Sequence, residues 1–259
     1  MLSILITHYN RPKALKKCID AFKEVLTKET KFEIVVSDDG SPPSVQNQFK
    51  KLPIDKLVLS ASNKGLTSNL NTGIRNCSGD YILYCQEDFI PKTELNENLQ
   101  EILQVLDSRK ADMVRMKANY TFPKLFGLTE NIKLIPKFSW KNFYYNTFQY
   151  SDHPFITTSS FFKTYGYFLE NTSGAYGENE YAIRIMKSNA KIAIMDTHLF
   201  KDNLNTTSVI EKHEVRKKRR FLKKIGAHKL VRAVRLHLEY VLYNPKKRGL
   251  ITLKNKRIN

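Results

Sequence analysis

From the N-terminus to about residue 195, short apolar runs alternate with longer segments whose apolar residues recur at steps of three and four. Short apolar runs bounded by turn residues are typical of buried strands, and steps of three and four place side chains on one face of a helix. The pattern predicts strands over 2–7, 32–37, 56–60, 81–85, 112–116 and 191–195, and helices over 12–26, 66–75, 94–106 and 179–188.

Strands that alternate with helices are joined by right-handed crossovers and give a sheet whose strands run mostly in parallel. We therefore predict the α/β fold class, with a mostly parallel central sheet flanked by helices on both faces, as in Rossmann-like nucleotide-binding proteins. Ligands of such sheets bind at the carboxyl ends of the strands. The loops that follow the predicted strands are therefore the first place to look for a site.

The charge of the chain is concentrated at its C-terminal end. The net charge is +18, and residues 211–259 alone hold 17 basic and 3 acidic side chains. A protein that handles nucleic acid is expected to spread basic residues over its main fold. The uneven distribution favours an ordinary domain that carries a basic appendage.

Length and composition exclude several other classes. With 259 residues and 41% hydrophobic residues, the chain has enough apolar material for a sizeable core. No apolar run approaches the roughly 20 residues of a membrane span, and residues 1–6 lack the basic start of a signal peptide. The three cysteines lack metal-ligand spacing, which favours reduced thiols in a cytoplasm and disfavours a disulfide scaffold or a zinc site.

Three polar clusters follow predicted strands, at residues 7–11, 38–41 and 86–88. Acidic groups that meet at one sheet edge repel one another unless a cation or hydrogen-bond donors join them, so their coincidence favours a binding site. The other interpretation is that residues 38–42 form only a turn and a helix cap.

The same residues resemble a known family, the family-2 nucleotide-sugar glycosyltransferases with the GT-A fold. The resemblance covers about residues 1–205 in the family's order. It lies in segments 4–12, 33–41, 63–65, 69–76, 79–88 and 176–180, together with Arg184. The resemblance implies a GT-A domain over 1–210, with a nucleotide-binding half over 1–116 and an acceptor-binding half over 117–210, followed by a basic amphipathic helical tail over 211–259.

The family's nucleotide and metal positions transfer to individual residues. The resemblance implies nucleotide binding by Thr7, Tyr9, Arg11, Asp38, Asp39, Asn63, Gly65 and Glu87. Asp88 takes the last position of the family's metal-binding triplet, where Mn²⁺ or Mg²⁺ bridges the diphosphate.

The chain departs from the family pattern at two of these positions. Gln86 stands where the family usually has aspartate, and Lys201 where it often has a histidine that holds metal or diphosphate. His198 lies three residues earlier and is a second metal candidate, with a structural histidine as the alternative. A lysine could neutralise diphosphate directly, so the dependence on a cation stays open.

For the catalytic base, the resemblance points to Glu178 at the start of a helix, with Glu180 as the alternative because Asn179 replaces the usual aspartate. Such a base takes the proton of an acceptor hydroxyl during in-line displacement. Both glutamates could instead only complement the helix dipole. Asp152 and His153 are candidates for contact with the acceptor or the donor sugar, or for a role in loop structure.

Residues 117–157 interrupt the alternation of strands and helices with many aromatic residues and with three prolines. We interpret this segment as an acceptor-side excursion packed on the sheet. A second piece of core without a ligand role is equally compatible, because aromatic rings commonly fill cores.

The tail carries a helical stripe of Leu230, Val231, Val234, Leu238, Val241 and Leu242, interleaved with basic residues. A basic amphipathic helix is typical of binding to an anionic membrane face. The alternative is that the stripe packs on the catalytic domain or on a second subunit, as in a homodimer. Nucleic acid is the least favoured partner, because the tail shows no recognised motif.

Together these observations predict a cytoplasmic enzyme, peripheral on the inner face of the membrane. It would transfer a sugar with inversion from a nucleoside diphosphate, UDP being favoured, to a hydroxyl of a glycan or lipid-linked glycan. The product would be a surface polysaccharide or glycolipid. Two alternatives stay open: a polyprenyl-phosphate glycosyltransferase, and a catalytically silent nucleotide-binding interaction protein.

Overall fold

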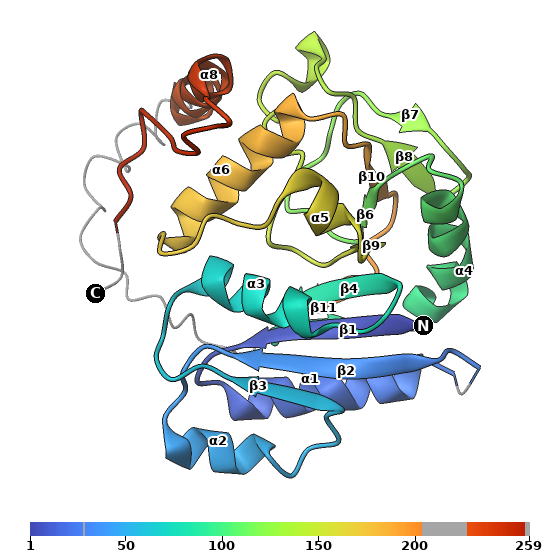
Figure 1. The fold of residues 1–259 in the computed structure, drawn as a ribbon. Coiled ribbons are helices and arrows are strands. Elements are labelled where there is room, and N and C mark those ends of the chain that lie inside the picture. The colour runs from blue at the N-terminus through green and yellow to red at the C-terminus, as the bar shows by residue number, and fades with distance from the viewer. Residues whose placement is uncertain (28, 204–226, 257–259) are drawn as a thin grey trace.

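A computed structural model describes residues 1–27, 29–203 and 227–256 (Figure 1). Its centre is a nine-stranded sheet with the order β3-β2-β1-β4-β9-β6-β10-β8-β7. The strands are β1 (Leu2–His8), β2 (Phe32–Asp38), β3 (Lys56–Leu59), β4 (Tyr81–Gln86), β6 (Met113–Arg115), β7 (Phe126–Gly127), β8 (Ile132–Leu134), β9 (Phe155–Thr158) and β10 (Ile192–Met195). Two short strands, β5 (Phe89–Pro91) and β11 (Phe200–Asp202), pair separately.

The helices cover both faces of the sheet. They are α1 (Pro12–Val25), α2 (Pro43–Phe49), α3 (Leu66–Asn76), α4 (Glu94–Asp107), α5 (Phe161–Tyr165), α6 (Gly174–Lys187) and α8 (Ala227–Leu242), with one 3-10 turn at Trp140–Asn142. Successive residues of β1 point to opposite faces. Ile4 and Ile6 pack with the apolar residues of α1, α2 and α4, whereas Leu5 packs with those of α3, α5 and α6. The predicted fold class, a mostly parallel sheet between two helical layers, is confirmed.

One strand that the sequence did not predict lies in the middle of the sheet. β9 runs antiparallel to both of its neighbours, β4 and β6, and comes from the end of the aromatic segment 117–157. The rest of that segment forms β7, β8 and the 3-10 turn at one end of the sheet. Because β9 sits beside β4, the residues just before it reach the carboxyl end of β4.

Helix α6 begins five residues before the predicted start at residue 179, which places Glu178 in its second turn and not at its N-terminus. The glycines in its first turn hid the helix, because glycine is a poor helix former. The chain needs glycine there, since a Cβ atom at Gly177 would overlap the side chain of Thr67 on α3. The close approach of α3 and α6 brings Glu178 over the sheet edge.

The tail contains the predicted helix, α8, which packs on α6 through a small core of Tyr176, Ile183, Leu236, Tyr243 and Leu250. The predicted boundary between residues 210 and 211 and the basic run over residues 216–220, upstream of α8, lie outside the described residues. No helix within the described ranges is long and apolar enough to cross a membrane.

Candidate active site

The ends of β1, β2 and β4 open into a cavity of about 500 Å³. Its walls come from the loops after these strands, from the start of α3 and from the first turns of α6. The lining residues are Thr7, His8, Tyr9, Arg11, Asp39, Asn63, Gly65, Leu66, Asn69, Gln86, Glu87, Asp88, Asp152, Gly174, Ala175 and Glu178. All of the residues expected to bind nucleotide, except Asp38, therefore meet in one cavity, which we call the donor cavity.

Asp38 is fully buried behind the donor cavity. Its carboxylate accepts hydrogen bonds from His8 Nδ1 at 2.7 Å and from the backbone N–H of Ser41 at 2.9 Å. Burial would raise the pKa of Asp38, but these hydrogen bonds outweigh burial and lower it. In the structure Asp38 thus makes the turn-forming contact that the sequence analysis gave as the alternative to nucleotide binding.

The neighbouring Asp39 lines the cavity and fixes the loop opposite. Its two carboxylate oxygens accept hydrogen bonds from the backbone N–H groups of Lys64, at 2.8 Å, and Gly65, at 2.9 Å. Burial raises the pKa of Asp39. The loop can approach because both Gly40 and Gly65 adopt positive φ angles, which glycine accepts without strain.

The floor of the donor cavity holds two acidic side chains and one arginine. Nη1 of Arg11 lies 3.1 Å from Asp88 Oδ2 and 3.4 Å from Glu87 Oε1. Burial and the charge of Asp88 raise the pKa of Glu87 to about 8, and burial raises the pKa of Asp88. Asp88 Oδ1 is buried without a hydrogen-bond partner.

The side chains at this floor supply only part of the ligands of a cation. Among the described residues, no three His, Cys, Asp or Glu side chains gather into a metal-binding group. However, the unpartnered oxygen of Asp88 is the kind of carboxylate ligand that Mg²⁺ or Mn²⁺ combines with substrate phosphates. A site of one carboxylate plus diphosphate oxygens is therefore compatible with this floor.

Gln86, which departs from the family pattern, makes a defined contact. Its Nε2 donates to the backbone oxygen of Asp152, at 3.3 Å, and to Asp152 Oδ2, at 3.2 Å. The backbone N–H of Asp152 in turn lies 3.4 Å from Glu178 Oε1. An aspartate at position 86 would place another carboxylate against Asp152. The neutral amide of Gln86 avoids that repulsion, so Asp152 and Glu178 can lie side by side.

Glu178 is half-buried at the junction of two cavities. Burial, together with the negative charge of Asp152, raises the pKa of Glu178 to about 8. A carboxylate whose pKa lies near neutrality can accept a proton in one step and release it in the next. Glu178 thus has the position and the acid strength expected of a general base.

Glu180, the other candidate base, faces the opposite side of α6 and lines neither cavity. It is fully buried and accepts hydrogen bonds from Arg184 Nε, at 3.2 Å, and from Tyr243, while Arg248 Nε lies 3.5 Å away. Two residues along a helix differ by about 200° in direction, which explains the separation. Glu180 therefore acts in the structure as the anchor that joins α6 to the tail.

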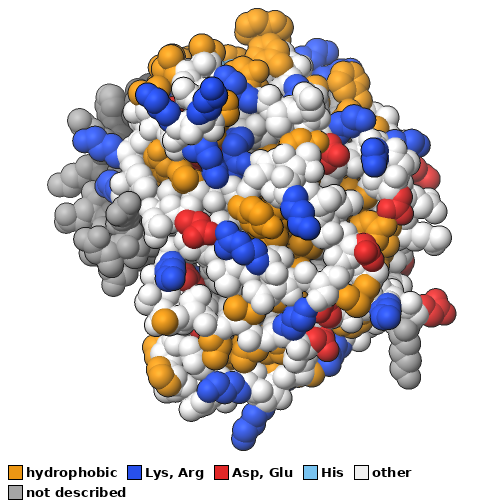
Figure 2. Space-filling model, in the orientation of Figure 1, with side chains coloured by type: hydrophobic (Ala, Val, Ile, Leu, Met, Phe, Trp, Pro, Cys, Tyr) orange, Lys and Arg blue, Asp and Glu red, His pale blue; other side chains and the backbone are white. Residues whose placement is uncertain are grey.

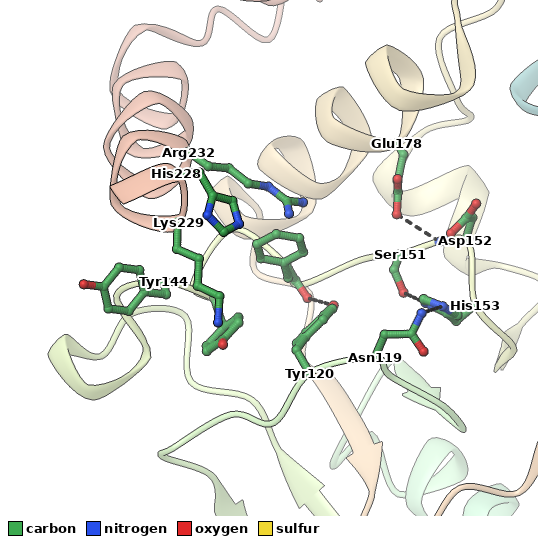
Figure 3. A pocket seen from close by; sticks show the side chains of 12 residues that line it. Asn119, Tyr120, Tyr144, Ser151, Asp152, His153, Glu178, His228, Lys229 and Arg232 are labelled. Carbon is green, nitrogen blue, oxygen red and sulfur yellow. Dashed lines mark hydrogen bonds between the residues drawn. The ribbon is translucent and has the colours of Figure 1, made fainter. Parts of the chain in front are cut away.

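A second cavity, of about 540 Å³, lies on the other side of Asp152 and Glu178 (Figure 3). Its walls are the aromatic segment and the first turns of α8. The lining residues are Asn119, Tyr120, Tyr144, Tyr145, Phe148, Ser151, Asp152, His153, Glu178, His228, Lys229 and Arg232. We call it the acceptor-side cavity. Some aromatic residues of segment 117–157 thus line this cavity, and others, such as Phe122 and Tyr150, are buried in the core.

His153 lines this cavity beside Asp152 with both ring nitrogens engaged. Nδ1 lies 3.0 Å from Ser151 Oγ, and Nε2 lies 3.0 Å from Asn119 Nδ2. Burial lowers the pKa of His153. These contacts hold the imidazole in place in the wall of the acceptor-side cavity.

His198 and Lys201 line neither cavity. Both side chains are exposed, and Lys201 lies in β11, opposite Ile90 of β5. Burial, followed by the positive charges of Lys117 and Lys92, lowers the pKa of His198. The structure therefore does not bring these two predicted metal or diphosphate residues to the Asp88 floor.

The apolar stripe of α8 is not the face of the helix that is buried. The six apolar residues of the stripe point away from the domain and are 45% to 70% exposed, whereas Ala233, Leu236 and Glu239 face inward and are buried. His228, Lys229 and Arg232 line the acceptor-side cavity, a role that sequence reasoning did not assign. The stripe does not pack on the described part of the catalytic domain.

Comparison with known proteins identifies the family of the chain. The sequence model of glycosyl transferase family 2 matches residues 3–171. An uncharacterized glycosyltransferase of Haemophilus influenzae is 32% identical over 112 residues, covering 41% of this chain and 35% of that protein. The glycosyltransferase GlyA of Streptococcus pneumoniae is 31% identical over 91 residues, covering 34% of this chain and 13% of that protein. The alignments thus span about a third or less of these relatives' own length.

Solved structures share the fold. Crystal structures of S. aureus TarS 1–349 superpose with a TM-score of 0.56 for the complex with UDP-GlcNAc and 0.58 for the complex with UDP, each at 17% identity. The first covers 80% of this chain and 61% of that chain, and the second covers 94% and 66%. The fold and the family expected from the sequence are therefore confirmed, and the chain belongs to glycosyl transferase family 2.

Proposed function

We propose that the protein transfers a sugar, with inversion, from a nucleoside-diphosphate donor to a hydroxyl of an acceptor, and that UDP is the donor nucleotide. The observation that carries the proposal is the wall of Asp152 and Glu178 shared by the two cavities. A donor in one cavity and an acceptor in the other would meet at Glu178. The UDP-bound TarS structures, which have the same fold, support the choice of nucleotide.

In this reaction Glu178 accepts the proton of the acceptor hydroxyl. The acceptor oxygen forms a bond to the anomeric carbon of the sugar from the face opposite the leaving group. The bond between that carbon and the diphosphate oxygen breaks, and the nucleoside diphosphate departs with the electron pair. The single displacement inverts the anomeric centre. Asp152, fixed by Gln86, lies beside Glu178 and raises its pKa, which strengthens it as a base.

The departing diphosphate carries negative charge, and Arg11 is the cationic side chain placed beside Glu87 and Asp88 at the floor. We propose that Asp88 Oδ1, the unpartnered oxygen, holds a divalent cation together with the diphosphate, either Mn²⁺ or Mg²⁺. A bound cation would supply further neutralisation of the diphosphate.

Donor turnover tests this function. The full chain is incubated with a panel of nucleoside-diphosphate sugars, each with Mn²⁺, with Mg²⁺ and with chelator, and nucleotide release is measured. We expect selective hydrolysis or binding of a UDP-sugar that the chelator weakens. Binding of a UDP-sugar without turnover under any condition would support the silent interaction protein instead. Transfer to polyprenyl phosphate, and not to soluble hydroxyl acceptors, would support the polyprenyl-phosphate alternative.

We propose further that the product is a surface polysaccharide or glycolipid made at the inner face of the membrane, and that the outward stripe of α8 contacts the bilayer. The stripe lies near Trp140, which is 79% exposed and stacks on Phe143, itself stacked on His237 of α8. Figure 2 shows apolar side chains together with Lys and Arg along the edge where α8 lies. Such a surface suits the interface of an anionic bilayer.

Trp140 is the only tryptophan of the chain, so its fluorescence reports directly on this contact. We expect a blue shift with vesicles of phosphatidylcholine and phosphatidylglycerol. The shift should be lost in the double variant Val234→Asp and Val241→Asp and kept in Leu59→Asp, an exposed apolar residue on β3. If the double variant instead changes the sedimentation of a dimer and leaves vesicle binding intact, the stripe is a homodimer interface.

A further inference from the structure

Arg115, the last residue of β6, is a buried cation beside the segment that carries Asp152. Its side chain is 1% exposed, and its Nε has no hydrogen-bond partner. Within the described ranges, no carboxylate forms an ion pair with the guanidinium. A buried charge is costly unless hydrogen bonds or an opposite charge offset it. The surroundings of Arg115 therefore indicate what the charge is for.

Three hydrogen bonds from the guanidinium hold the chain next to Asp152. Nη1 donates to the backbone oxygen of Phe148 at 2.7 Å, and Nη2 donates to Ser151 Oγ at 2.6 Å and to Tyr120 Oη at 2.8 Å. On the far side of Asp152, β6 pairs antiparallel with β9. The segment is thus tied to β6 both before and after Asp152.

This segment turns only two residues toward the cavities. From residue 149 to residue 157 the chain is buried except at Asp152 and His153, which line the acceptor-side cavity, and at the segment's other positions no side chain lines either cavity apart from Ser151. Ser151 Oγ, which accepts the hydrogen bond from Arg115, also lies 3.0 Å from His153 Nδ1. Arg115 therefore acts from the interior on the wall that the two cavities share.

The charge of Arg115 also acts on Glu178. Burial, together with the charge of Asp152, raises the pKa of Glu178 to about 8, and the positive charge of Arg115 opposes that rise. When Glu178 is ready to accept a proton, it and Asp152 both carry negative charge. Arg115 supplies positive charge to this pair, and the two acids in turn offset part of the buried charge of Arg115.

Other titratable groups also surround Glu178. Tyr150, in the segment before β9, is close enough for the charge of Glu178 to act on it. The charged or titratable side chains that share a cavity with Glu178 include Arg11, Glu87 and Asp88 on the donor side and His153, His228, Lys229 and Arg232 on the acceptor side. All of these groups are kept in the variants below, so the comparison isolates Arg115.

We infer that Arg115 is a positioning residue for the proposed transfer reaction. Its guanidinium holds residues 148–153 so that Asp152 lies beside Glu178, and its charge balances the two acids in the state that accepts the proton of the acceptor hydroxyl. Arg115 itself lines neither cavity. The inference rests on the proposed function and adds a residue that acts on the base from behind the site.

A double-mutant cycle tests the charge of Arg115 without the need for turnover. Urea unfolding at pH 4.5 and 9.5 is measured for the wild type, Glu178→Gln, Arg115→Met and the double variant. We expect Glu178→Gln to stabilise the Arg115→Met background more than the wild type at pH 9.5, where Glu178 is ionised, and equally at pH 4.5, where it is neutral. The expected difference corresponds to a rise of about one pKa unit, or up to about 1.4 kcal/mol.

Two variants control this cycle. Arg115→Lys keeps a positive charge without the planar fork of donors, so the difference should fall back toward the wild-type value. Arg184→Met is the matched control, because it removes a half-buried guanidinium that contacts Glu180 on the other side of α6. Its cycle with Glu178→Gln should give the same coupling at both pH values.

Ser151→Ala tests the positioning. It removes one acceptor of the guanidinium and keeps the buried charge, so it is expected to fold even if Arg115→Met does not. We expect kcat for nucleotide release from a UDP-sugar to fall about tenfold, with the affinity for UDP unchanged in calorimetry. Arg115→Lys should show the same separation of kcat from UDP affinity, because one ammonium cannot replace the fork.

Two results would overturn the inference: the same gain from Glu178→Gln with and without Arg115 at pH 9.5, or an unchanged kcat in both Ser151→Ala and Arg115→Lys. Turnover by the wild type in that case leaves the proposed function intact. Absence of turnover by the wild type with every UDP-sugar contradicts the proposed function instead, while the unfolding cycle still decides whether Arg115 balances the two acids. The two failures are therefore distinguishable.

Discussion

Replacing Glu178 by glutamine should stabilise the fold while it removes activity. The folded protein raises the pKa of Glu178 from 4.5 to about 8, through burial and the charge of Asp152. Between these two pH values the unfolded chain binds fewer protons than the folded one, so the contribution of Glu178 to stability is fully present below pH 4.5 and is lost as pH rises through 8.

The size of the effect follows from the shift. Each pKa unit corresponds to about 1.4 kcal/mol, which sets an upper limit of about 5 kcal/mol above pH 8. Because Glu178 is only half-buried, solvent reduces this figure, and we expect about 1 to 3 kcal/mol. Glu178→Gln removes the charge and keeps the shape, so it should match the wild type near pH 4.5 and exceed it by this amount at pH 8.5.

Urea unfolding at pH 4.5 and 8.5 measures the difference, and nucleotide release measures the chemistry. Removal of a general base costs about 10² to 10⁴ in kcat. The wild-type kcat/KM should rise with pH toward about 8 as Glu178 loses its proton, and the variant should lack this rise. Glu180→Gln is the matched control: it breaks a buried ion cluster and should lower stability by about 3 kcal/mol.

The reasoning is refuted if Glu178→Gln is no more stable than the wild type at pH 8.5. Retention of full turnover would separately remove Glu178 from the role of base. Equal losses of stability in Glu178→Gln and Glu180→Gln would contradict the difference between the two glutamates that the hydrogen bonds of Glu180 indicate.

Three further changes have defined outcomes. Asp88→Asn should lower UDP affinity in Mn²⁺ about tenfold and abolish the effect of chelator, as calorimetry would show; unchanged cation dependence would exclude Asp88 as a ligand. Gln86→Glu places a carboxylate at the 3.2 Å contact with Asp152 and should lower kcat about tenfold with UDP affinity retained, in steady-state kinetics. Gly40→Ala, at a φ of 73° and with a Cβ atom 2.7 Å from the nitrogen of Asn63, should destabilise the protein by about 2 kcal/mol. An unchanged Tm would contradict that strain.

The strands β1, β2 and β4 were predictable because they are buried on both faces. Residues 2–7 and 81–85 are nearly continuous apolar runs, and such runs identify parallel strands without further information. The polar residues that follow them mark the donor cavity for the same reason, since parallel strands end at one edge.

β9 could not be predicted from its own four residues. Phe155–Thr158 alternates little in polarity, and it is held in the sheet by β4 and β6, which lie far away in the sequence. Tertiary contacts of this kind outweigh local preference for short strands. The position of Asp152 beside Glu178 depends on β9, so that part of the site was also hidden.

The buried face of α8 could not be predicted from the sequence, for a different reason. An apolar stripe ordinarily predicts the buried face of a helix, yet α8 buries Ala233, Leu236 and Glu239 instead. The Glu239 carboxylate accepts hydrogen bonds from the backbone N–H groups of Ile251 and Thr252 and from the Thr252 hydroxyl, and this local pairing lets a charged residue face inward. The pattern of hydrophobic residues along the chain does not predict such a polar contact.

The division of labour between the sheet and α8 has a consequence for how such an enzyme diversifies. The strand ends build the donor cavity, whereas the far wall of the acceptor-side cavity comes from a helix late in the chain. If the acceptor binds in the acceptor-side cavity as we propose, substitutions in α8 are expected to alter acceptor choice while the donor cavity stays unchanged. Chimeras that exchange only the segment from residue 227 onward would then change the product.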